Sequence, residues 1–230
     1  MSYPDGLPYA TGDLIGGQWN PYIMANSGET TRNSADVVGT VGLTYQISDN
    51  FALEADVTMN NISTKEMIFR ESRSDMTNYV TGEPVGASSW FSSNTLQEGT
   101  YTRRELSQRA FMNYSNSIGV HNFNGLLGYE EIHTQADQFS AARSGFFNRD
   151  LRLLSAGDSG NQRTCQSSDD AGSFTGGCLK DEWRVRSFFG RANYTFNDKY
   201  TIQANVRYDG SSRFAAGNRW GFFPSFSAGW

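Results

Sequence analysis

Two hairpins with period-two alternation constrain the fold of this chain more than any other feature of its sequence. Apolar residues occupy every second position from residue 37 to 47, and after Asp49-Asn50 the alternation continues to residue 60. The same unit returns over residues 187–209, around Asn197-Asp198-Lys199. This pattern predicts strands with one apolar and one polar face, joined by short turns into antiparallel hairpins.

A middle hairpin has a less regular pattern. A strand interpretation puts Leu106, Ala110, Met112 and Tyr114 on one face, with a turn at 116–119 and a return through Phe123, Leu127 and Tyr129. A helix is the alternative, because Thr102-Arg103-Arg104-Glu105 matches a capping box. Asn124-Gly125 is also a turn signal inside the proposed return strand. We favour strands because they repeat the flanking units.

The chain is therefore expected to be all-β, with about seven strands in an antiparallel sheet that does not close on itself. The strands are expected near 35–48, 51–65, 99–115, 121–140, 182–196, 200–214 and 222–230. Turns between hairpin partners are short, whereas the linkers near 66–97 and 144–181 are long and polar. Short turns on one side and long loops on the other are typical of transmembrane β-barrels of outer membranes.

Composition agrees with such strands. Hydrophobic residues make up 37% of the chain, aromatic residues 14%, and there are 24 glycines. No run approaches the roughly 18 apolar residues of a membrane helix. A net charge of −5 without a basic block argues against a nucleic-acid surface. Met1 is not followed by a basic and then an apolar region, so no signal peptide is predicted. Trp230 falls inside a predicted strand, which favours a segment of a larger protein.

The alternation also predicts which side chains meet lipid. The convex, lipid-facing set is Val37, Val41, Leu43, Tyr45, Leu53, Val57, Ala192, Tyr194, Ile202, Val206 and Tyr208. The concave, water-facing set is Gln46, Glu54, Asp56, Arg191, Gln203, Arg207 and Asp209. The aromatic residues beside the short turns are expected to form an interfacial girdle; they are Tyr45, Phe51, Tyr114, Phe196 and Tyr200.

The two cysteines, Cys165 and Cys178, lie in one Gly/Ser/Asp-rich segment. In an oxidising compartment such a pair predicts a disulfide that holds a loop. Two free thiols in a reducing cytosol are the alternative.

Catalytic and metal-binding patterns find little support. His121 and His133 lie in no metal-ligand spacing, so no metal site and no cofactor is expected. Glu54 and Asp56 share a strand face, as a carboxylate pair in a glycosidase would, but a polar lumen wall explains them better. The chain is therefore not expected to be an enzyme. The loop aromatics Trp90, Phe91, Phe146 and Phe147 could stack on a substrate, or could pack against the barrel rim.

The C-terminal sequence carries a long motif. It comprises Lys199-Tyr200, Arg207-Tyr208 with Asp209, Gly210, Ser211, Ser212, Arg213 and Phe214, and Asn218-Arg219-Trp220-Gly221-Phe222-Phe223-Pro224-Ser225-Phe226-Ser227-Ala228-Gly229-Trp230. Further matches are Asp5-Gly6, Asn20-Pro21, His121-Asn122-Phe123 and Leu127-Gly128-Tyr129-Glu130. These residues resemble the barrel signature of SusC/RagA-type TonB-linked outer-membrane transporters over nearly the whole chain.

The resemblance implies a Gram-negative, Bacteroidetes-like outer membrane and a barrel of about 22 strands. It implies a plug, a SusD-like surface lipoprotein, the TonB–ExbB–ExbD complex as energy source, and a glycan or peptide as substrate. Residues 1–230 would be part of the barrel domain only, without plug, signal peptide or terminal strand. The motif from Asp209 to Phe214 is expected to be structural, with Gly210 turning the strand end and Asp209 pairing with Arg213; a ligand site is the alternative. A passive pore or adhesin barrel, or a soluble carbohydrate-binding β-sandwich, is the alternative.

Overall fold

The computed structural model describes residues 9–10, 27–72, 77–78, 93–148, 150–165 and 177–230. The chain divides into two compact units, and strands β2, β3, β5, β6 and β8 contribute residues to both, β8 only its first residue to unit 1. Unit 1 comprises Met1–Ser34, Ser63–Tyr101 and Gln138–Leu179. Unit 2 comprises Ala35–Ile62, Thr102–Asp137 and Lys180–Trp230.

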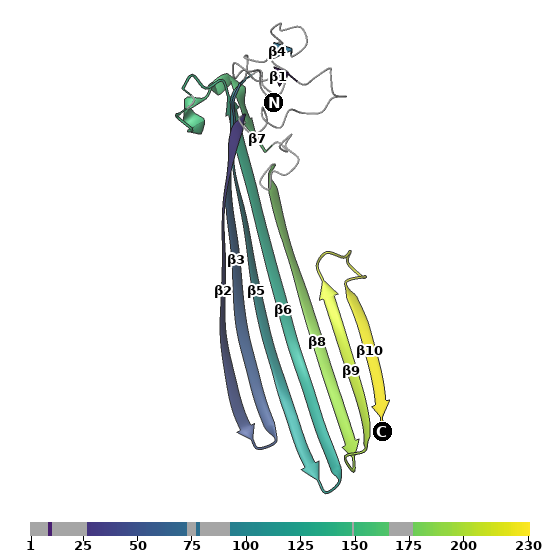
Figure 1. The fold of residues 1–230 in the computed structure, drawn as a ribbon. Helices are drawn as coiled ribbons and strands as arrows, with labels where there is room; N and C mark the ends of the chain where they lie inside the picture. Colours follow the sequence, from purple (N-terminus) through teal and green to yellow (C-terminus); the bar gives the residue numbers. More distant parts are fainter. Residues whose placement is uncertain (1–8, 11–26, 73–76, 79–92, 149, 166–176) are drawn as a thin grey trace. The chain divides into compact units, whose positions relative to one another are not determined.

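Strands account for most of the described residues (Figure 1). Seven long strands are β2 (Gly28–Ser48), β3 (Phe51–Arg70), β5 (Thr95–Ile118), β6 (His121–Ser144), β8 (Leu179–Phe196), β9 (Tyr200–Ser211) and β10 (Trp220–Gly229). The short elements are β1 (Tyr9–Ala10), β4 (Thr77–Asn78), β7 (Gln162–Thr164) and the 3-10 helices η1 (Leu154–Ala156) and η2 (Ser159–Asn161). Within the part of the chain that the structure describes, no helix has both the length and the apolar character needed to span a membrane.

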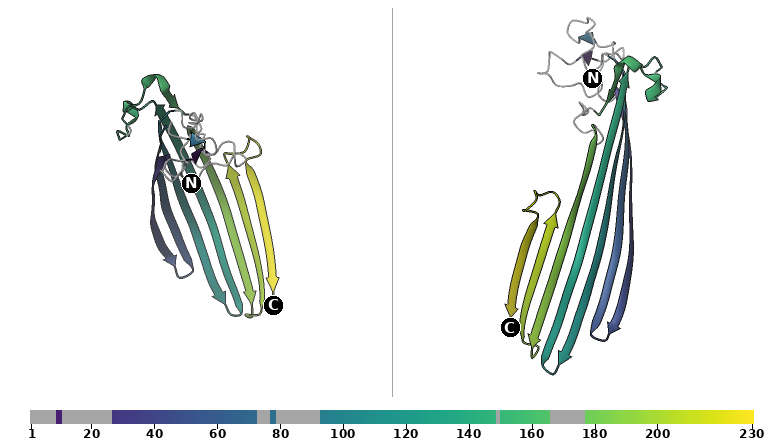
Figure 2. Two further views of the ribbon diagram at one scale, coloured as in Figure 1. Left: turned by 45° about the horizontal axis from the view of Figure 1, so that its top comes forward. Right: turned by 180° about the vertical axis from the view of Figure 1, so that it is seen from behind.

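The long strands form one open sheet in the order β10-β9-β8-β6-β5-β3-β2, and β7 adds to β6 (Figure 1). Strand β9 pairs antiparallel with both β8 and β10. Consecutive long strands are neighbours in this order, and the views in Figure 2 show the same order. Strands β2 and β10 form the two edges, and among the described residues neither has a partner on its outer side.

The turns at one end of unit 2 explain why hairpins form there. Asn197 and Asp198 have φ angles of 51° and 52°, and Gly119 has a φ of 62°. Asn, Asp and Gly are the residues that adopt this left-handed region at least cost. The backbone N–H of Asn197 donates to the carbonyl of Val120 at 2.8 Å, so adjacent hairpins are also tied at their turns.

Two glycines in unit 2 make room for aromatic rings across the sheet. A Cβ atom on Gly128 would lie 2.3 Å from ring atoms of Phe189, and one on Gly210 would lie 2.7 Å from the indole of Trp220. Each ring therefore covers the bare backbone of the neighbouring strand. Gly210 lies inside β9 and does not turn the strand end, so the prediction for this residue is wrong.

Unit 1 has a small apolar core of its own. Phe69, Leu96 and Phe146 are buried there, and Met67, Leu154 and Ala156 pack against them. The side-chain amide of Asn94 donates to the carbonyl of Phe146, and its oxygen accepts from the N–H of the same residue, both at 2.7 Å. This paired bond holds the loop after β6 against the start of β5.

All seven predicted strands are present, and the open antiparallel sheet is confirmed. The helix alternative is wrong, because residues 102–105 lie within β5. The predicted turn at 116–119 is misplaced, since β5 continues to Ile118 and the turn is Gly119-Val120. Strands β2, β3, β5 and β6 also extend further into the loops than expected. The short parallel pair of β1 and β4 departs from an all-antiparallel arrangement.

We expect Gly128→Ala to destabilise the protein by about 1–3 kcal/mol, because the added methyl group displaces the Phe189 ring from a packed position. Gly39→Ala is the matched control, since a Cβ at Gly39 has nothing within 4 Å. Urea unfolding of the purified full-length protein measures both changes. Equal stability of the two variants would show that the ring has other room.

Candidate functional site: the two faces of the sheet

Strand register in unit 2 assigns side chains to two faces. Phe188 pairs with Tyr208 and Tyr208 with Phe222, whereas Phe189 pairs with Arg207. Because side chains alternate along a strand, each face contains every second residue of β8, β9 and β10. The set that includes Phe188 is the apolar face, and the set that includes Arg207 is the polar face.

The apolar face is exposed. Val206 and Ile202 are 41% and 58% exposed, and Leu53 and Val57 on β3 are 44% and 47% exposed. In β3 the polar residues between them are less exposed, which reverses the usual order of a soluble protein. An uncovered apolar face of this size needs a lipid or protein partner.

Hydrogen bonds and ion pairs run across the polar face. Arg109 on β5 donates to Asp56 on β3 at 3.0 Å, and Asn113 donates to Glu54 at 2.7 Å. Each carboxylate of the predicted pair, Glu54 and Asp56, therefore accepts a hydrogen bond from a side chain of the neighbouring strand β5. Among the described residues no group of His, Cys, Asp and Glu could hold a metal ion.

Arg207 is the centre of the polar face on β9. It contacts Asp209 at 2.7 Å and Glu130 at 3.1 Å, and it donates to the buried hydroxyl of Ser187 at 2.9 Å. Its guanidinium carbon lies 5.6 Å from the centroid of the Phe189 ring. A charge with so many partners fixes the register of β6, β8 and β9 at one point.

The motif residues are therefore arranged differently from the prediction. Asp209 pairs with Arg207 and not with Arg213. Arg213 instead approaches Asp181 at 3.4 Å and lies 4.6 Å from the centroid of Trp183. Ser211 accepts from the N–H of Arg213, Ser212 accepts from the N–H of Arg184, and Phe214 is exposed.

Aromatic side chains form two groups on the apolar face. Phe196 lies 5.2 Å from His121 at the short turns, and the nearby Phe51 and Tyr114 rings are 4.7 Å apart. The second group, which the sequence analysis missed, stacks Trp220 on Tyr208 at 4.7 Å, with Phe188 and Tyr129 beside them. The pairing of Gly210 with Trp220 could have indicated it only once the register was known.

The two loop aromatics that the structure describes, Phe146 and Phe147, differ in exposure. Trp90 and Phe91 lie outside the described residues. Phe146 is 5% exposed and packs on Phe69 at a ring distance of 6.2 Å, so an exposed stacking role is wrong for it. Phe147 is fully exposed.

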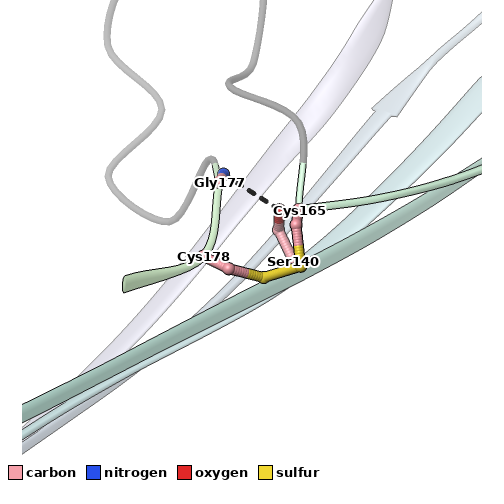
Figure 3. The surroundings of a disulfide bond; sticks show 4 residues. All are labelled: Ser140, Cys165, Gly177 and Cys178. Atoms are coloured by element: carbon pink, nitrogen blue, oxygen red, sulfur yellow. Dashed lines mark hydrogen bonds between the residues drawn. A yellow bond between two sulfur atoms is a disulfide. The ribbon is translucent and has the colours of Figure 1, made fainter. Parts of the chain in front are cut away.

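The two cysteines form a disulfide in unit 1, with their Cα atoms 4.6 Å apart (Figure 3). The bond joins the segment after β7 to the residue before β8. Ser140 on β6 holds both sides, because its carbonyl accepts from Cys165 N–H and its hydroxyl accepts from Gly177 N–H at 2.9 Å and 3.0 Å. The bridge therefore fastens the base of this loop to β6.

Comparisons with known proteins agree with this geometry. No protein-family model matches the chain. It is 27% identical to the TonB-dependent receptor P26 of Formosa agariphila over 98% of the chain and 21% of that protein. It is 30% identical to the TonB-dependent receptor SusC of Bacteroides thetaiotaomicron over 57% of the chain and 12% of that protein. The chain thus spans about a fifth or less of the curated relatives it matches.

Among solved structures, the RagAB peptide transporter matches 96% of the chain and 22% of its own chain, with a TM-score of 0.75 and 22% identity. The same fold matches the RagAB peptide importer in its 'open-open' state, with a TM-score of 0.74. This likeness concerns the fold.

An open antiparallel sheet with an exposed apolar face and a hydrogen-bonded polar face is a wall segment of an outer-membrane β-barrel. Within that class, the chain is similar to a barrel segment of TonB-dependent receptors, SusC among them.

We expect Val206→Arg to destabilise the full-length protein by about 2–4 kcal/mol, because it places a charge on the face that meets hydrocarbon. Gln203→Arg is the control, since Gln203 belongs to the polar face and contacts Asn205 there. Outer-membrane yield and urea unfolding measure the difference. Equal yields and equal stabilities would contradict the assignment of faces.

Replacing both cysteines by serine should lower the free energy of unfolding by about 3 kcal/mol in the entropic model. The two cysteines are 13 residues apart in sequence, and without the bridge the unfolded chain between them is no longer closed into a loop and gains conformational entropy. Ser140→Ala is the control, since it removes one hydroxyl acceptor and leaves the bridge, at a cost of about 1 kcal/mol. Unfolding under oxidising conditions measures both. A double variant as stable as the parent would contradict a stabilising bridge.

Proposed function

We propose that this chain supplies wall strands and loop residues to a TonB-dependent importer of a bulky nutrient such as a glycan or peptide. The observation that carries the proposal is the polar face of unit 2, whose charges are paired both along β9 and between strands. A face of this kind suits a water-filled lumen, whereas the opposite face suits lipid. The similarity to SusC and other TonB-dependent receptors supports active transport.

The two open edges support membership of a larger barrel. In a membrane, unpaired N–H and C=O groups at a strand edge carry a high free-energy cost, so spanning sheets close. Strands β2 and β10 would therefore pair with further strands of a longer protein. A barrel of about 22 strands encloses a lumen wide enough to need a plug, and gated uptake then requires an energy source.

The partners follow from the same relationship. We infer that a plug elsewhere in the longer protein connects it to the TonB complex, and that a SusD-like lipoprotein lies over its outer opening. Paired charges and hydroxyl groups along the wall suit a hydrated, polar cargo. The exposed Phe147 offers a stacking surface to a sugar ring or to an apolar peptide side chain.

Two alternatives are less well supported. A soluble carbohydrate-binding sandwich would bury the apolar face of each sheet, whereas Val41, Leu43 and Ile202 are all more than half exposed. A passive pore or adhesin shares the two-faced strands. It is disfavoured by the similarity to TonB-dependent receptors, and transport measurements distinguish it directly.

The test uses cells that carry the full-length gene with its TonB-binding segment deleted. They are supplied with a labelled oligopeptide mixture and, separately, with labelled oligosaccharides. We expect the intact protein to take up one of the two pools and the deletion variant to take up neither, with unchanged amounts of barrel in the outer membrane. Uptake at an unchanged rate after the deletion would identify a passive pore.

A proton-motive-force uncoupler is the control. It should reproduce the loss of uptake in cells with the intact protein, because the energising complex then has no gradient to use. An intact protein that takes up neither pool would contradict the assignment of a bulky glycan or peptide as cargo.

A further inference from the structure

The apolar face of unit 2 becomes charged at a defined level on β8. Arg186 pairs across the sheet with Gly210, and Gly210 pairs with Trp220. The first charged residue of this face, Arg186, therefore lies at the same level of the sheet as Trp220. Two residues further back toward the short turns, the same face carries Phe188. From Phe188 to the short turn, the described apolar-face residues of β8, β9 and β10 include no charged side chain.

The width of this uncharged band matches a membrane. Gly210, at the level of Trp220, and Tyr200, at the short turns, are ten residues apart on β9. At about 3.3 Å per residue this is ~33 Å along the strand, and a tilt of about 40° reduces it to a height of ~25 Å. The apolar band of outer-membrane barrels is about 25 Å tall. Because short turns face the periplasm in such barrels, Arg186 lies at the outer-leaflet headgroups.

Neighbouring side chains hold the charged level in place. The Nε of Arg186 donates to Glu131 on β6 at 2.8 Å. The side chain of Arg186 is 53% exposed and that of Glu131 only 19%, so the cation is the outer member of the pair. Arg184, on the same face, is 48% exposed and reaches Glu182 at the long distance of 3.4 Å. Glu182 has its nearer contact with His133, at 2.7 Å.

We propose that Arg186 and Arg184 bind the phosphate groups of lipid headgroups in the outer leaflet, with Trp220 and Phe188 against the adjoining acyl chains. A guanidinium group has five N–H donors in a planar fork that suits phosphate, and one contact to a carboxylate leaves several of them for a second anion. Glu131 then positions the Arg186 side chain. The proposal depends on the membrane location of the sheet and is independent of what is transported.

Lipid fits this surface better than a protein partner. The two arginines lie at the border of an apolar band that is itself exposed along three strands, and the aromatic group marks the same border. Interfacial aromatic residues with cations beside them are the usual arrangement at a lipid headgroup layer. A soluble partner would need to displace lipid from Phe188 and Phe222 to cover these arginines.

The test measures binding of monophosphorylated lipid A to the full-length protein in detergent by native mass spectrometry. The variant is Arg184→Gln with Arg186→Gln, and the control is Arg191→Gln, an exposed arginine on the polar face that contacts Asn205. We expect the double variant to bind about tenfold more weakly, since it loses charge-assisted bonds, and the control to bind normally. Dephosphorylated lipid A should bind the parent as weakly as phosphorylated lipid A binds the double variant.

Three results would overturn the proposal. They are equal binding of phosphorylated lipid A by parent and double variant, an equal loss in Arg191→Gln, and competition by inorganic phosphate at millimolar concentration, which would indicate a free-anion site. If the double variant does not fold, Arg184→Gln alone decides, because its one described side-chain contact is long and a partial loss is still expected. Neither outcome of this binding test decides whether the protein imports a nutrient, which the uptake measurements test separately.

Discussion

Hydrogen bonding between neighbouring strands is the interaction on which the rest of this structure depends. In a membrane every backbone N–H and C=O group needs a partner within the protein, and a ladder of antiparallel strands provides it without a second layer. The sheet can therefore leave its apolar side chains uncovered by protein, as Val41 and Ile202 are. The same ladder obliges alternate residues to face the opposite side, where paired charges gather.

Side chains of different character fix the register of the ladder on each face. On the polar face, Arg207 contacts Glu130 on β6 and Ser187 on β8, so a slip of β9 by one residue would separate the charge from both of these partners. On the apolar face, the Trp220 ring occupies the space that Gly210 leaves open. In unit 1 the small core around Phe69 and the bridge at Cys165 hold the loop bases.

Much of the fold could be predicted from the sequence, because it follows from local signals. Alternation located the four strands of the two regular hairpins, the middle hairpin was inferred because it repeats them, and Asn197-Asp198 and Asp49-Asn50 located two of the turns. Predictions that depended on which side chains are neighbours in space were less accurate. The partner of Asp209 is set by i, i+2 spacing on one strand face, whereas Arg213 follows the strand end and turns toward Asp181. Phe146 is buried because Asn94 binds its backbone, 52 residues away in sequence.

One face of the sheet meets lipid and the other meets water. Spin labels on single cysteines introduced in turn at residues 202 to 207 of the full-length protein, in lipid nanodiscs, test it most directly. Accessibility to oxygen, which partitions into lipid, should peak at Ile202, Ala204 and Val206. Accessibility to a water-soluble nickel complex should peak at Gln203, Asn205 and Arg207. Equal accessibility to the nickel complex at all six positions would contradict the account.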